Sequence, residues 1–250
     1  MINIQEKLED GTELYGWKSE PPLTPFAPSY AHYLTDKKIF SEEECKEWNT
    51  YLLTQERILL DKFRTTFTDG GTGLGGLSIT SRYRDFNVLK FNFHLVERLK
   101  IEIFNGIRCL LDISGNTAWQ DTLYANCWFN VLRQGEQMAM HSHGYHSNIF
   151  YGFHLNINVI ETFTSYIHPI KFQEDTFHVP NKIGYLTLFP CLVPHSVSMN
   201  RYITPRITIA GDIFPASGMG VQLLRPDITE IEKSAVKIGT IENNTPKDIR

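Results

Sequence analysis

The chain has 250 residues, of which 42% are hydrophobic and 21% are charged, close to the averages of globular proteins. This composition excludes disordered, collagen-like and coiled-coil chains, and a formal net charge of −4 argues against general attraction to nucleic acid or anionic membranes. The four cysteines lie far apart without a C-x-x-C motif, no apolar run reaches the ~20 residues of a membrane span, and no signal peptide is visible. We therefore expect a soluble, cytoplasmic protein with no membrane partner.

The first predicted element is a helix. Residues 1–38 are expected to be irregular, because the prolines between 21 and 28 exclude a long helix. Ser41 and Glu44 then form a capping box, the signature of a helix start. Apolar residues follow at helical spacing, so the pattern predicts a helix from about 42 to 64.

A glycine-rich segment follows the first helix. Residues 69–77 contain a G-x-G-x-x-G arrangement, but no hydrophobic strand precedes it and no helix begins at its last glycine. Both are required for a dinucleotide-binding fingerprint, so a surface loop or lid is the favoured interpretation. A second helix is predicted over 87–112, whose single apolar face is typical of a buttress packed on a sheet.

From Gly115 onward the apolar residues recur with a period of two, which indicates strands. Regularly spaced strands separated by turn residues indicate an antiparallel sandwich or barrel. The expected strands are 123–132, 149–159, 167–173, 183–189 and 206–213.

The sequence turns polar after Pro215. We expect residues 216–250 to form a peripheral arm with a short helix near 228–236, and its end to be frayed. The arm is a candidate for oligomer contacts, for example in a homodimer.

Candidate metal ligands gather in the strand-rich half, where six of the nine histidines lie between 141 and 178. His141 and His143 are separated by one residue, and residues i and i+2 of an extended segment point to the same side. Both imidazoles can therefore face one metal ion, and His195 is the best candidate for a third ligand. Arg206 opens the next strand in line with Thr208, and an inward arginine is costly unless it meets an anion such as a dicarboxylate. Each of these residues alone has an ordinary alternative as a surface or loop residue.

The ordered set resembles the iron(II)/2-oxoglutarate-dependent oxygenase superfamily, whose double-stranded β-helix (jelly roll) carries H-x-D/E, a distal histidine and a downstream arginine or lysine. More narrowly, it is similar to a bacterial and phage branch with W-x-N, a glycine turn, H-x-H, S-x-x-x-Y, G-x-L-x-L-F-P, H-x-V and arginine. The matching residues here are Trp128, Asn130, Gly135, His141, His143, Ser147, Tyr151, Gly184 to Pro190, His195, Val197 and Arg206. The resemblance covers about residues 119–215.

The resemblance implies a mostly β fold with flanking helices. Residues 119–215 would form the jelly-roll catalytic core, residues 1–118 would supply supporting helices, and 216–250 would be the arm, all within one structural domain. The reaction implied is hydroxylation of a peptidyl residue or small metabolite with release of succinate and CO2.

The resemblance also implies a set of site residues. Fe(II) would be held by His141, His143 and His195, and O2 would be the oxidant. Arg206 would pair with the distal carboxylate of 2-oxoglutarate, and Thr208, Tyr151 and Asn130 would assist.

The resemblance also suggests which residues would contact the substrate. Asn126 and Trp128 would line the pocket, and Arg82 and Arg84, just beyond the glycine-rich loop, would touch the substrate. A solvated loop is an equally good interpretation of that basic pair. A small molecule or a peptide fits, and the acidic net charge disfavours nucleic acid.

One position departs from the family pattern, because His143 stands where a carboxylate is expected. We favour a three-histidine site. The alternatives are His141 and His195 with water or an anion, His143 then lying behind the metal ligands, or a carboxylate from outside the motif such as Glu136 or Asp212. Two other functions also remain open: a three-histidine dioxygenase that does not use 2-oxoglutarate, and a non-catalytic jelly roll for structure or binding.

Overall fold

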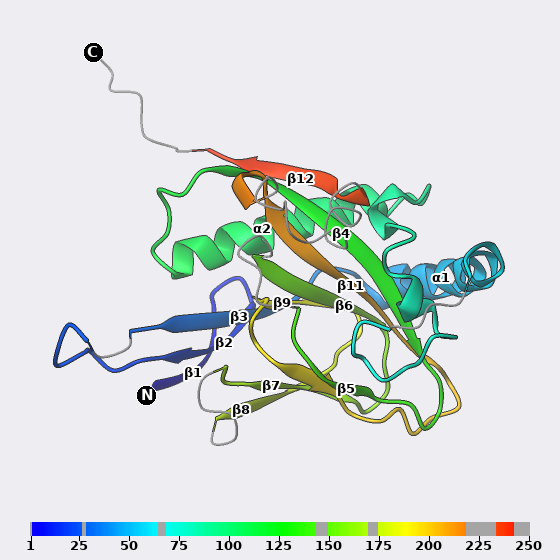
Figure 1. Ribbon diagram of the computed structural model, residues 1–250, viewed down its shortest axis with the longest axis horizontal. Helices are drawn as coiled ribbons and strands as arrows, with labels where there is room; N and C mark the ends of the chain where they lie inside the picture. Colours follow the sequence, from blue (N-terminus) through cyan, green and yellow to red (C-terminus); the bar gives the residue numbers. More distant parts are fainter. Residues whose placement is uncertain are drawn as a thin grey trace, which may run out of the picture.

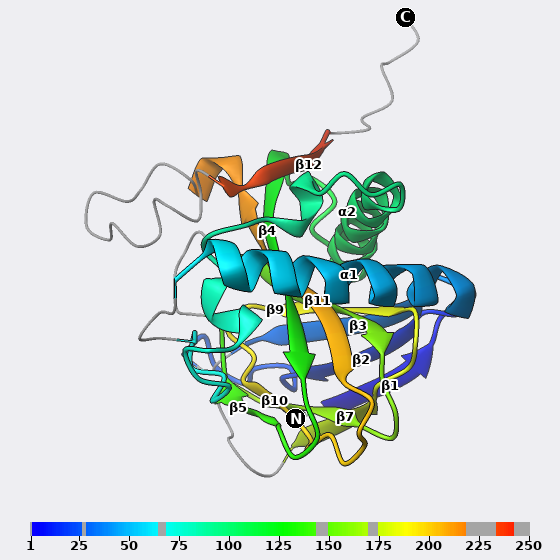
Figure 2. The same cartoon turned by 90° about the vertical axis from the view of Figure 1, so that its right-hand side faces the viewer.

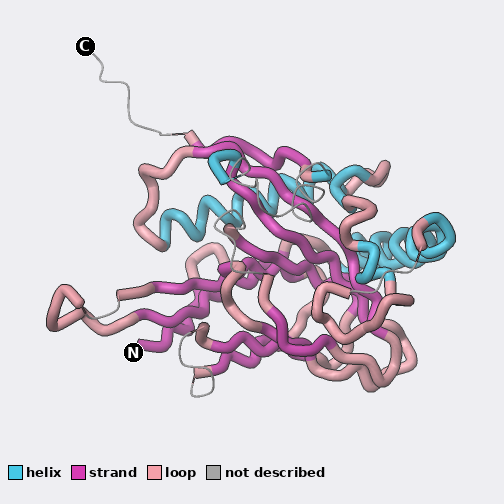
Figure 3. Tube along the Cα trace, in the orientation of Figure 1, coloured by secondary structure: helices cyan, strands magenta, loops and turns pink. Residues whose placement is uncertain are grey.

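The structure is a computed structural model that describes residues 2–26, 29–64, 69–143, 150–169, 175–218 and 234–242. Two antiparallel sheets dominate it, one above the other in Figure 1, and strands make up most of its regular structure (Figure 3). The predicted fold class is confirmed: the molecule is mostly β, with the double-stranded β-helix at its centre and helices on one side.

The larger sheet has eight strands in the order β1-β2-β3-β9-β6-β11-β4-β12. Most residues of its central strands β9, β6, β11 and β4 are buried. The bounds are β1 Ile2–Lys7, β2 Glu13–Lys18, β3 Ala31–Lys38, β4 Asp121–Leu132, β6 Tyr151–Asn158, β9 Tyr185–Pro190, β11 Arg206–Pro215 and β12 Val236–Ile241.

The smaller sheet has four strands in the order β5-β10-β7-β8. The chain enters it three times, from β4 into β5, from β6 into β7 and β8, and from β9 into β10, so each of these segments follows a strand of the larger sheet. The bounds are β5 Met138–His141, β7 Phe163–Ile167, β8 Thr176–Pro180 and β10 His195–Val197.

Two long helices, α1 (Glu42–Lys62) and α2 (Val96–Ile113), cover the outer face of the larger sheet, and α1 crosses in front of its strands in Figure 2. The predicted capping box at the start of α1 is confirmed: the Ser41 hydroxyl accepts from the Glu44 amide, and the Glu44 carboxylate accepts from the Ser41 amide. Short 3-10 turns lie at Ile79–Arg82, Val88–Lys90 and Ala216–Gly218. None of the helices in the described ranges is long and apolar enough to cross a membrane.

The prediction that residues 1–38 are irregular was wrong, because three strands lie there. The prolines do exclude a helix, but they are confined to the connection between β2 and β3. On either side of that connection the chain is extended, and Trp17 and Leu34 are fully buried. The alternation of apolar and polar residues in these strands extends over only six to eight residues. The nearby proline cluster was therefore the stronger indication, and it favoured irregular structure.

Three other boundaries also differ from the prediction. The second helix starts at Val96 rather than near 87, because Asn87 caps a 3-10 turn and its amide donates to the carbonyl of Ala125 on β4. The strand expected at 167–173 is β7, which ends at Ile167; residues 170–174 lie outside the described ranges. Most of the helix expected near 228–236 also lies outside them, and β12 pairs with β4 where the arm is described again.

Alternation along the central strands separates an apolar face from a polar one. On β11, Ile207 and Ile209 point to the helices and join the main hydrophobic core. Arg206, Thr208 and Asp212 lie on the opposite face, toward the smaller sheet, and all three are buried. The interior between the two sheets is therefore lined by polar groups that the fold has removed from water.

Gly184 joins the start of β9 to the segment that leads into α1. Its φ is +80°, and an added Cβ would lie 2.1 Å from the carbonyl oxygen of Phe40. We expect Gly184→Ala to lower the free energy of unfolding by about 2–4 kcal/mol, because it combines a left-handed backbone with a steric clash. Gly11→Ala is the matched control, since Gly11 has φ +83° and open space around it. Equal losses in urea unfolding would contradict this account.

Candidate metal centre and anion site

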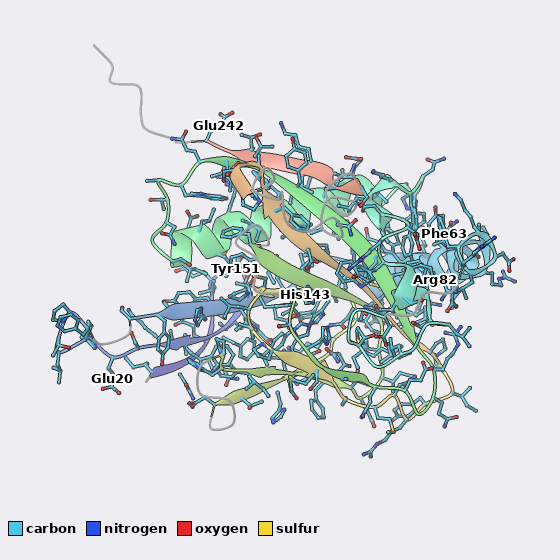
Figure 4. All side chains as sticks on the ribbon, in the orientation of Figure 1. Glu20, Phe63, Arg82, His143, Tyr151 and Glu242 are labelled. Carbon is cyan, nitrogen blue, oxygen red and sulfur yellow. The ribbon has the colours of Figure 1, made fainter. Side chains whose placement is uncertain are left out.

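Three histidines converge where the two sheets meet. His141 ends β5 and His195 begins β10, and the two are paired across the smaller sheet. His143 follows two residues after His141, and Figure 4 shows it between the sheets. One ring nitrogen from each histidine lies within 4.8 Å of the other two, a spacing at which one metal ion can be bound by all three.

Hydrogen bonds orient all three rings in the same way. The Nδ1 atom of His141 donates to the carbonyl of Ala139 at 2.8 Å, and that of His195 donates to the carbonyl of Val193 at 3.1 Å. A carbonyl only accepts, so each Nδ1 must carry the hydrogen. The remaining Nε2 atoms then present lone pairs, as metal ligation requires.

His143 is held by a carboxylate instead of a carbonyl. Its Nδ1 donates to Asp212 on β11, and both side chains are buried. A carboxylate behind a ligating imidazole fixes the tautomer and makes the ring a stronger donor to metal. Asp212 thus lies next to the cluster and lends it negative charge without joining it.

Burial keeps the rings of His141 and His195 neutral. Desolvation, with His143 nearby, lowers the pKa of His141 to about 4. Desolvation, together with His141 and His143, lowers the pKa of His195 well below its ordinary value. Neutral imidazole is the form that binds metal, so protons do not compete for these two ligands at neutral pH.

Neither carboxylate considered as a third ligand joins the cluster. Asp212 bonds His143, and the Glu136 carboxylate accepts from the backbone amide of Arg133 in the β4–β5 turn. Within the described ranges, the potential metal-binding group consists of three histidines alone. The donor set fits a metal that accepts imidazole, such as iron.

Arg206 is a buried cation on the same interior face. It is 2% exposed, and its Nη2 donates to the Asn156 side chain at 3.3 Å. Its Nε and Nη1 have no hydrogen-bond partner within the part of the chain that the structure describes. Burial lowers the pKa of Arg206 to about 10, so it is still charged at neutral pH. A buried, incompletely bonded guanidinium is costly unless an anion binds it.

Thr208 and Asn130 are linked beside Arg206. The Asn130 amide donates to the Thr208 hydroxyl at 3.4 Å, and its oxygen accepts from Thr80 at 2.8 Å. Asn130 is therefore fixed at both ends, and Thr208 keeps its own O–H available as a donor. The structure thus places Thr208 toward the interior, with Asn130 orienting it.

His154 is an interior residue that sequence reasoning missed. It lies on β6, is 8% exposed, and its Nε2 is 2.5 Å from the Tyr166 hydroxyl. Its Nδ1 has no partner among the described residues. The alternation of the strand already set His154 apart from the apolar face, and that signal could have identified it.

Tyr151 was predicted to assist 2-oxoglutarate binding, but it lies on the other face of β6. It pairs with Ile213 and packs against the core under the helices (Figure 4). Successive strand residues point to opposite faces, so Tyr151 and His154 cannot share one. Ser147 of the same motif lies outside the described ranges.

Two residues predicted to contact the substrate have structural contacts instead. The buried Arg82 donates through Nη1 to the carbonyls of Gly76 and Ser78, and so fastens the glycine-rich loop. The Asn126 side chain accepts from Ser234 at 2.9 Å and donates to the carbonyl of Tyr83 at 3.5 Å, which ties the arm to β4.

Trp128 and Arg84 lie closer to the histidines. The Trp128 ring is 5.9 Å from His143 and 5.6 Å from Tyr83, measured between centroids. Arg84 lies over the Tyr83 ring and donates to its hydroxyl at 2.8 Å. A row of aromatic rings thus leads from the half-buried Arg84 to the histidine cluster.

The glycine-rich loop is held in place on both sides. The Asp69 carboxylate accepts from the amides of Gly71 and Gly75, and the Thr72 carbonyl accepts from the amide of Ala139 on β5. Ala139 is also the residue whose carbonyl holds His141. The loop therefore covers the edge of the smaller sheet and helps to fix one ligand.

No protein-family model and no curated protein sequence matches this chain. Solved structures do, at low identity. AviO1 from Streptomyces viridochromogenes is 10% identical with a TM-score of 0.51, over 74% of this chain and 90% of that one. SnoN, described as a non-heme alpha-ketoglutarate-dependent epimerase from nogalamycin biosynthesis, is 13% identical with a TM-score of 0.49, over 73% and 76%. ThoJ, a non-heme monooxygenase solved with nickel, is 14% identical with a TM-score of 0.48, over 71% of both chains. At these identities the similarity is one of fold.

Proposed function

We propose that this protein is an iron(II)- and 2-oxoglutarate-dependent oxygenase. The observation that carries the proposal is the pairing of two features on one interior face: three imidazoles oriented to bind one metal, and a buried arginine with unfilled donors. The first suits a non-haem iron, and the second suits an acid that chelates the metal with its other end. Together they describe a site for a metal and a dicarboxylate.

The roles of the residues follow from their positions. His141, His143 and His195 would hold the metal, Arg206 would pair with the distal carboxylate of 2-oxoglutarate, and Thr208 would donate a further hydrogen bond. When bound, iron and 2-oxoglutarate supply the oxidation by O2, with succinate and CO2 as products of the co-substrate. The chain itself orients the co-substrate and excludes water, because the ligands lie among buried rings such as Phe189, 4.5 Å from His195.

We propose that the substrate is a small metabolite or a peptidyl residue that is hydroxylated beside Trp128. Its approach would follow Tyr83 and Arg84, whose rings and charge favour an aromatic or anionic group. None of the four cysteines forms a disulfide, which supports a reducing compartment such as the cytoplasm.

An anaerobic titration tests the proposal. The apo-protein is titrated with iron(II) and then with 2-oxoglutarate while the visible spectrum is recorded. A metal-to-ligand charge-transfer band that appears only with both would establish chelation of the keto acid at the iron. No iron binding at all would overturn the proposal and leave the jelly roll as a scaffold.

A second candidate is a three-histidine dioxygenase that does not use 2-oxoglutarate, which the ligand set itself favours. In the same titration it predicts iron binding without the charge-transfer band. Arg206 argues against it, because its unfilled donors would then have no anion to bind. The non-catalytic alternative predicted histidines that point apart, whereas these three converge.

The Asp212 carboxylate is expected to strengthen metal binding through His143. Asp212→Asn should weaken iron(II) affinity by about 10- to 100-fold, the usual effect of losing a carboxylate behind a ligating histidine. Asp121→Asn, at a half-buried β4 carboxylate bonded to Ser217, is the control and should leave affinity unchanged. Calorimetric titration with iron(II) measures both variants. An unchanged affinity in Asp212→Asn would show that His143 does not bind the metal.

A further inference from the structure

Gly152 is a glycine inside a regular, buried strand. It lies on β6 between Tyr151 and Phe153, and it pairs with Asp212 on β11 and with Phe189 on β9. Glycine weakens the interior of a strand, so its usual reasons there are a bulge, a left-handed backbone or the close approach of another group. The pairing of Gly152 and its neighbours is continuous on both sides, which excludes a bulge, and its φ is not positive. Close approach of another group is the reason that remains.

Two aromatic side chains occupy the space above Gly152. A Cβ added there would lie 2.7 Å from Cε2 and 2.9 Å from Cζ of Phe189, and 3.1 Å from Nδ1 of His143. Non-bonded carbon atoms prefer a separation of about 3.5–4.0 Å, so any side chain at this position would displace one ring or both. The missing side chain of Gly152 is therefore what allows both rings to lie against β6.

Phe189 is enclosed by other rings, two of which belong to the histidine cluster. It is 1% exposed, and its centroid lies 5.4 Å from that of His143, edge to face, and 4.5 Å from that of His195. Tyr166 packs against it as well, at 5.5 Å. Close-packed interiors transmit such displacements, so a shift of Phe189 would also move rings of the cluster.

His143 is held at the same place by a hydrogen bond. Its Nδ1 donates to the carboxylate of Asp212, the residue paired with Gly152 on β11. The Cβ at 3.1 Å would touch this same Nδ1 atom, and hydrogen bonds weaken steeply when their geometry is distorted. Asp212, Gly152 and Phe189 thus form a row across three strands, here called the ring seat, whose middle member must lack a side chain.

We propose that Gly152 is a positioning residue of the metal centre: the space above it seats the His143 ring between Asp212 and Phe189, so that an imidazole reaches the metal from this position. The inference rests on the proposed function, because it assumes that the three histidines hold iron. It also gives a physical reason for the H-x-H motif. A seat bounded by a carboxylate suits a ring that donates a hydrogen bond to it, whereas a second carboxylate there would be repelled.

The first test is the iron(II) affinity of Gly152→Ala, measured anaerobically by calorimetry. The added methyl group is expected to displace His143 and to weaken binding by about 10- to 100-fold, as the loss of a contact that orients a ligand usually does. Gly239→Ala is the matched control. Gly239 lies on β12, its φ is not positive either, and an added Cβ would lie 2.4 Å from the ring of Phe104 on α2. This variant should lose stability in urea unfolding and keep its iron(II) affinity.

Two further readouts distinguish positioning of His143 from a general loss of stability. In the apo-protein, the N–H of His143 that is donated to a buried carboxylate should give a downfield proton resonance, assigned by its loss in His143→Gln. We expect this signal in wild type and in Gly239→Ala, and its absence in Gly152→Ala. In protein loaded with one equivalent of copper(II), which imidazole binds tightly, pulsed electron paramagnetic resonance should count three imidazoles in wild type and two in Gly152→Ala.

A second variant keeps the inference testable if Gly152→Ala does not fold. Gly152→Ala/Phe189→Leu removes the ring carbons nearest the new methyl group and leaves its contact with Nδ1 of His143. This double variant is expected to fold and to lack the His143 resonance. Phe189→Leu alone should retain the resonance, because Asp212 still accepts from the ring. A double variant with both the resonance and the wild-type iron(II) affinity would contradict the inference.

The outcomes separate this inference from the function on which it rests. If Gly152→Ala folds and binds iron(II) as tightly as wild type, Gly152 does not position a ligand and the oxygenase proposal stands. If Gly239→Ala loses as much affinity as Gly152→Ala, affinity merely follows stability and the inference is wrong as well. If wild type binds no iron(II), the proposed function fails, and the inference about the metal centre fails with it.

Discussion

Replacing Arg206 with methionine is expected to abolish 2-oxoglutarate binding and at the same time to stabilise the protein. The guanidinium is 2% exposed, and within the described ranges no carboxylate forms an ion pair with it. Replacing such a group with a well-packed apolar side chain typically stabilises by about 1–3 kcal/mol. The same change removes a bidentate charge-assisted contact to the ligand, worth about 3–5 kcal/mol or at least ~100-fold in affinity.

Two measurements on Arg206→Met check both halves of this prediction. Thermal unfolding without ligand should give a higher midpoint than wild type, and iron(II) titration should give an unchanged affinity because Arg206 is no ligand. Arg206→Lys is the control, because it keeps the positive charge but loses the paired N–H donors of the guanidinium. Its 2-oxoglutarate affinity should therefore be intermediate. Loss of iron binding with unchanged keto-acid binding would contradict the assignment of Arg206.

The histidine cluster was predictable because its first two members are a local pattern. His141 and His143 point to one side through strand geometry alone, and no tertiary knowledge is needed for that step. His195 is different, since it meets His141 only because β10 pairs with β5. Its place shortly after a predicted strand made it the best candidate and the family resemblance supported it, but neither could show this pairing.

The residues behind the ligands were harder to predict, because their roles depend on partners distant in sequence. Asp212 and His143 are 69 positions apart, and Asp212 was considered as a metal ligand, whereas the structure makes it the hydrogen-bond acceptor for His143. Nothing in a single sequence distinguishes these roles, because both need a buried carboxylate near the metal. Only the register of β11 against its neighbours decides between them.

Tyr151 and His154 show a different kind of error, which the sequence alone could have prevented. The alternation of β6 puts Tyr151 with Phe153 and Leu155 on the apolar face and His154 on the polar one. A motif match assigned Tyr151 to the co-substrate, although its position in the alternation of the strand placed its side chain under the helices. Where a motif match and the alternation of a regular strand disagree, the alternation determines to which face of the sheet the side chain points.

Replacing His143 with aspartate is expected to weaken metal binding, although it creates the H-x-D pattern of the family that the motif resembles. The introduced carboxylate would face Asp212, and both positions are buried in the present structure. Two carboxylates in one desolvated site repel each other, so one of them is held protonated. We expect His143→Asp to lower iron(II) affinity by about 10- to 100-fold relative to wild type.

The same geometry predicts that Asp212→Asn has opposite effects on iron(II) affinity in the wild-type and His143→Asp backgrounds. Beside His143 it removes the acceptor that orients the ring and should weaken iron(II) binding, whereas beside the introduced aspartate it removes a repulsive charge and should strengthen binding at least tenfold. Calorimetric iron(II) affinities of wild type, the two single variants and His143→Asp/Asp212→Asn close a double-mutant cycle, with an expected coupling free energy of about 3 kcal/mol. An effect of Asp212→Asn that had the same sign and size in both backgrounds would mean that the two residues act independently. The hydrogen bond between them would then have no part in holding the metal, and the third ligand position would belong to water or another anion.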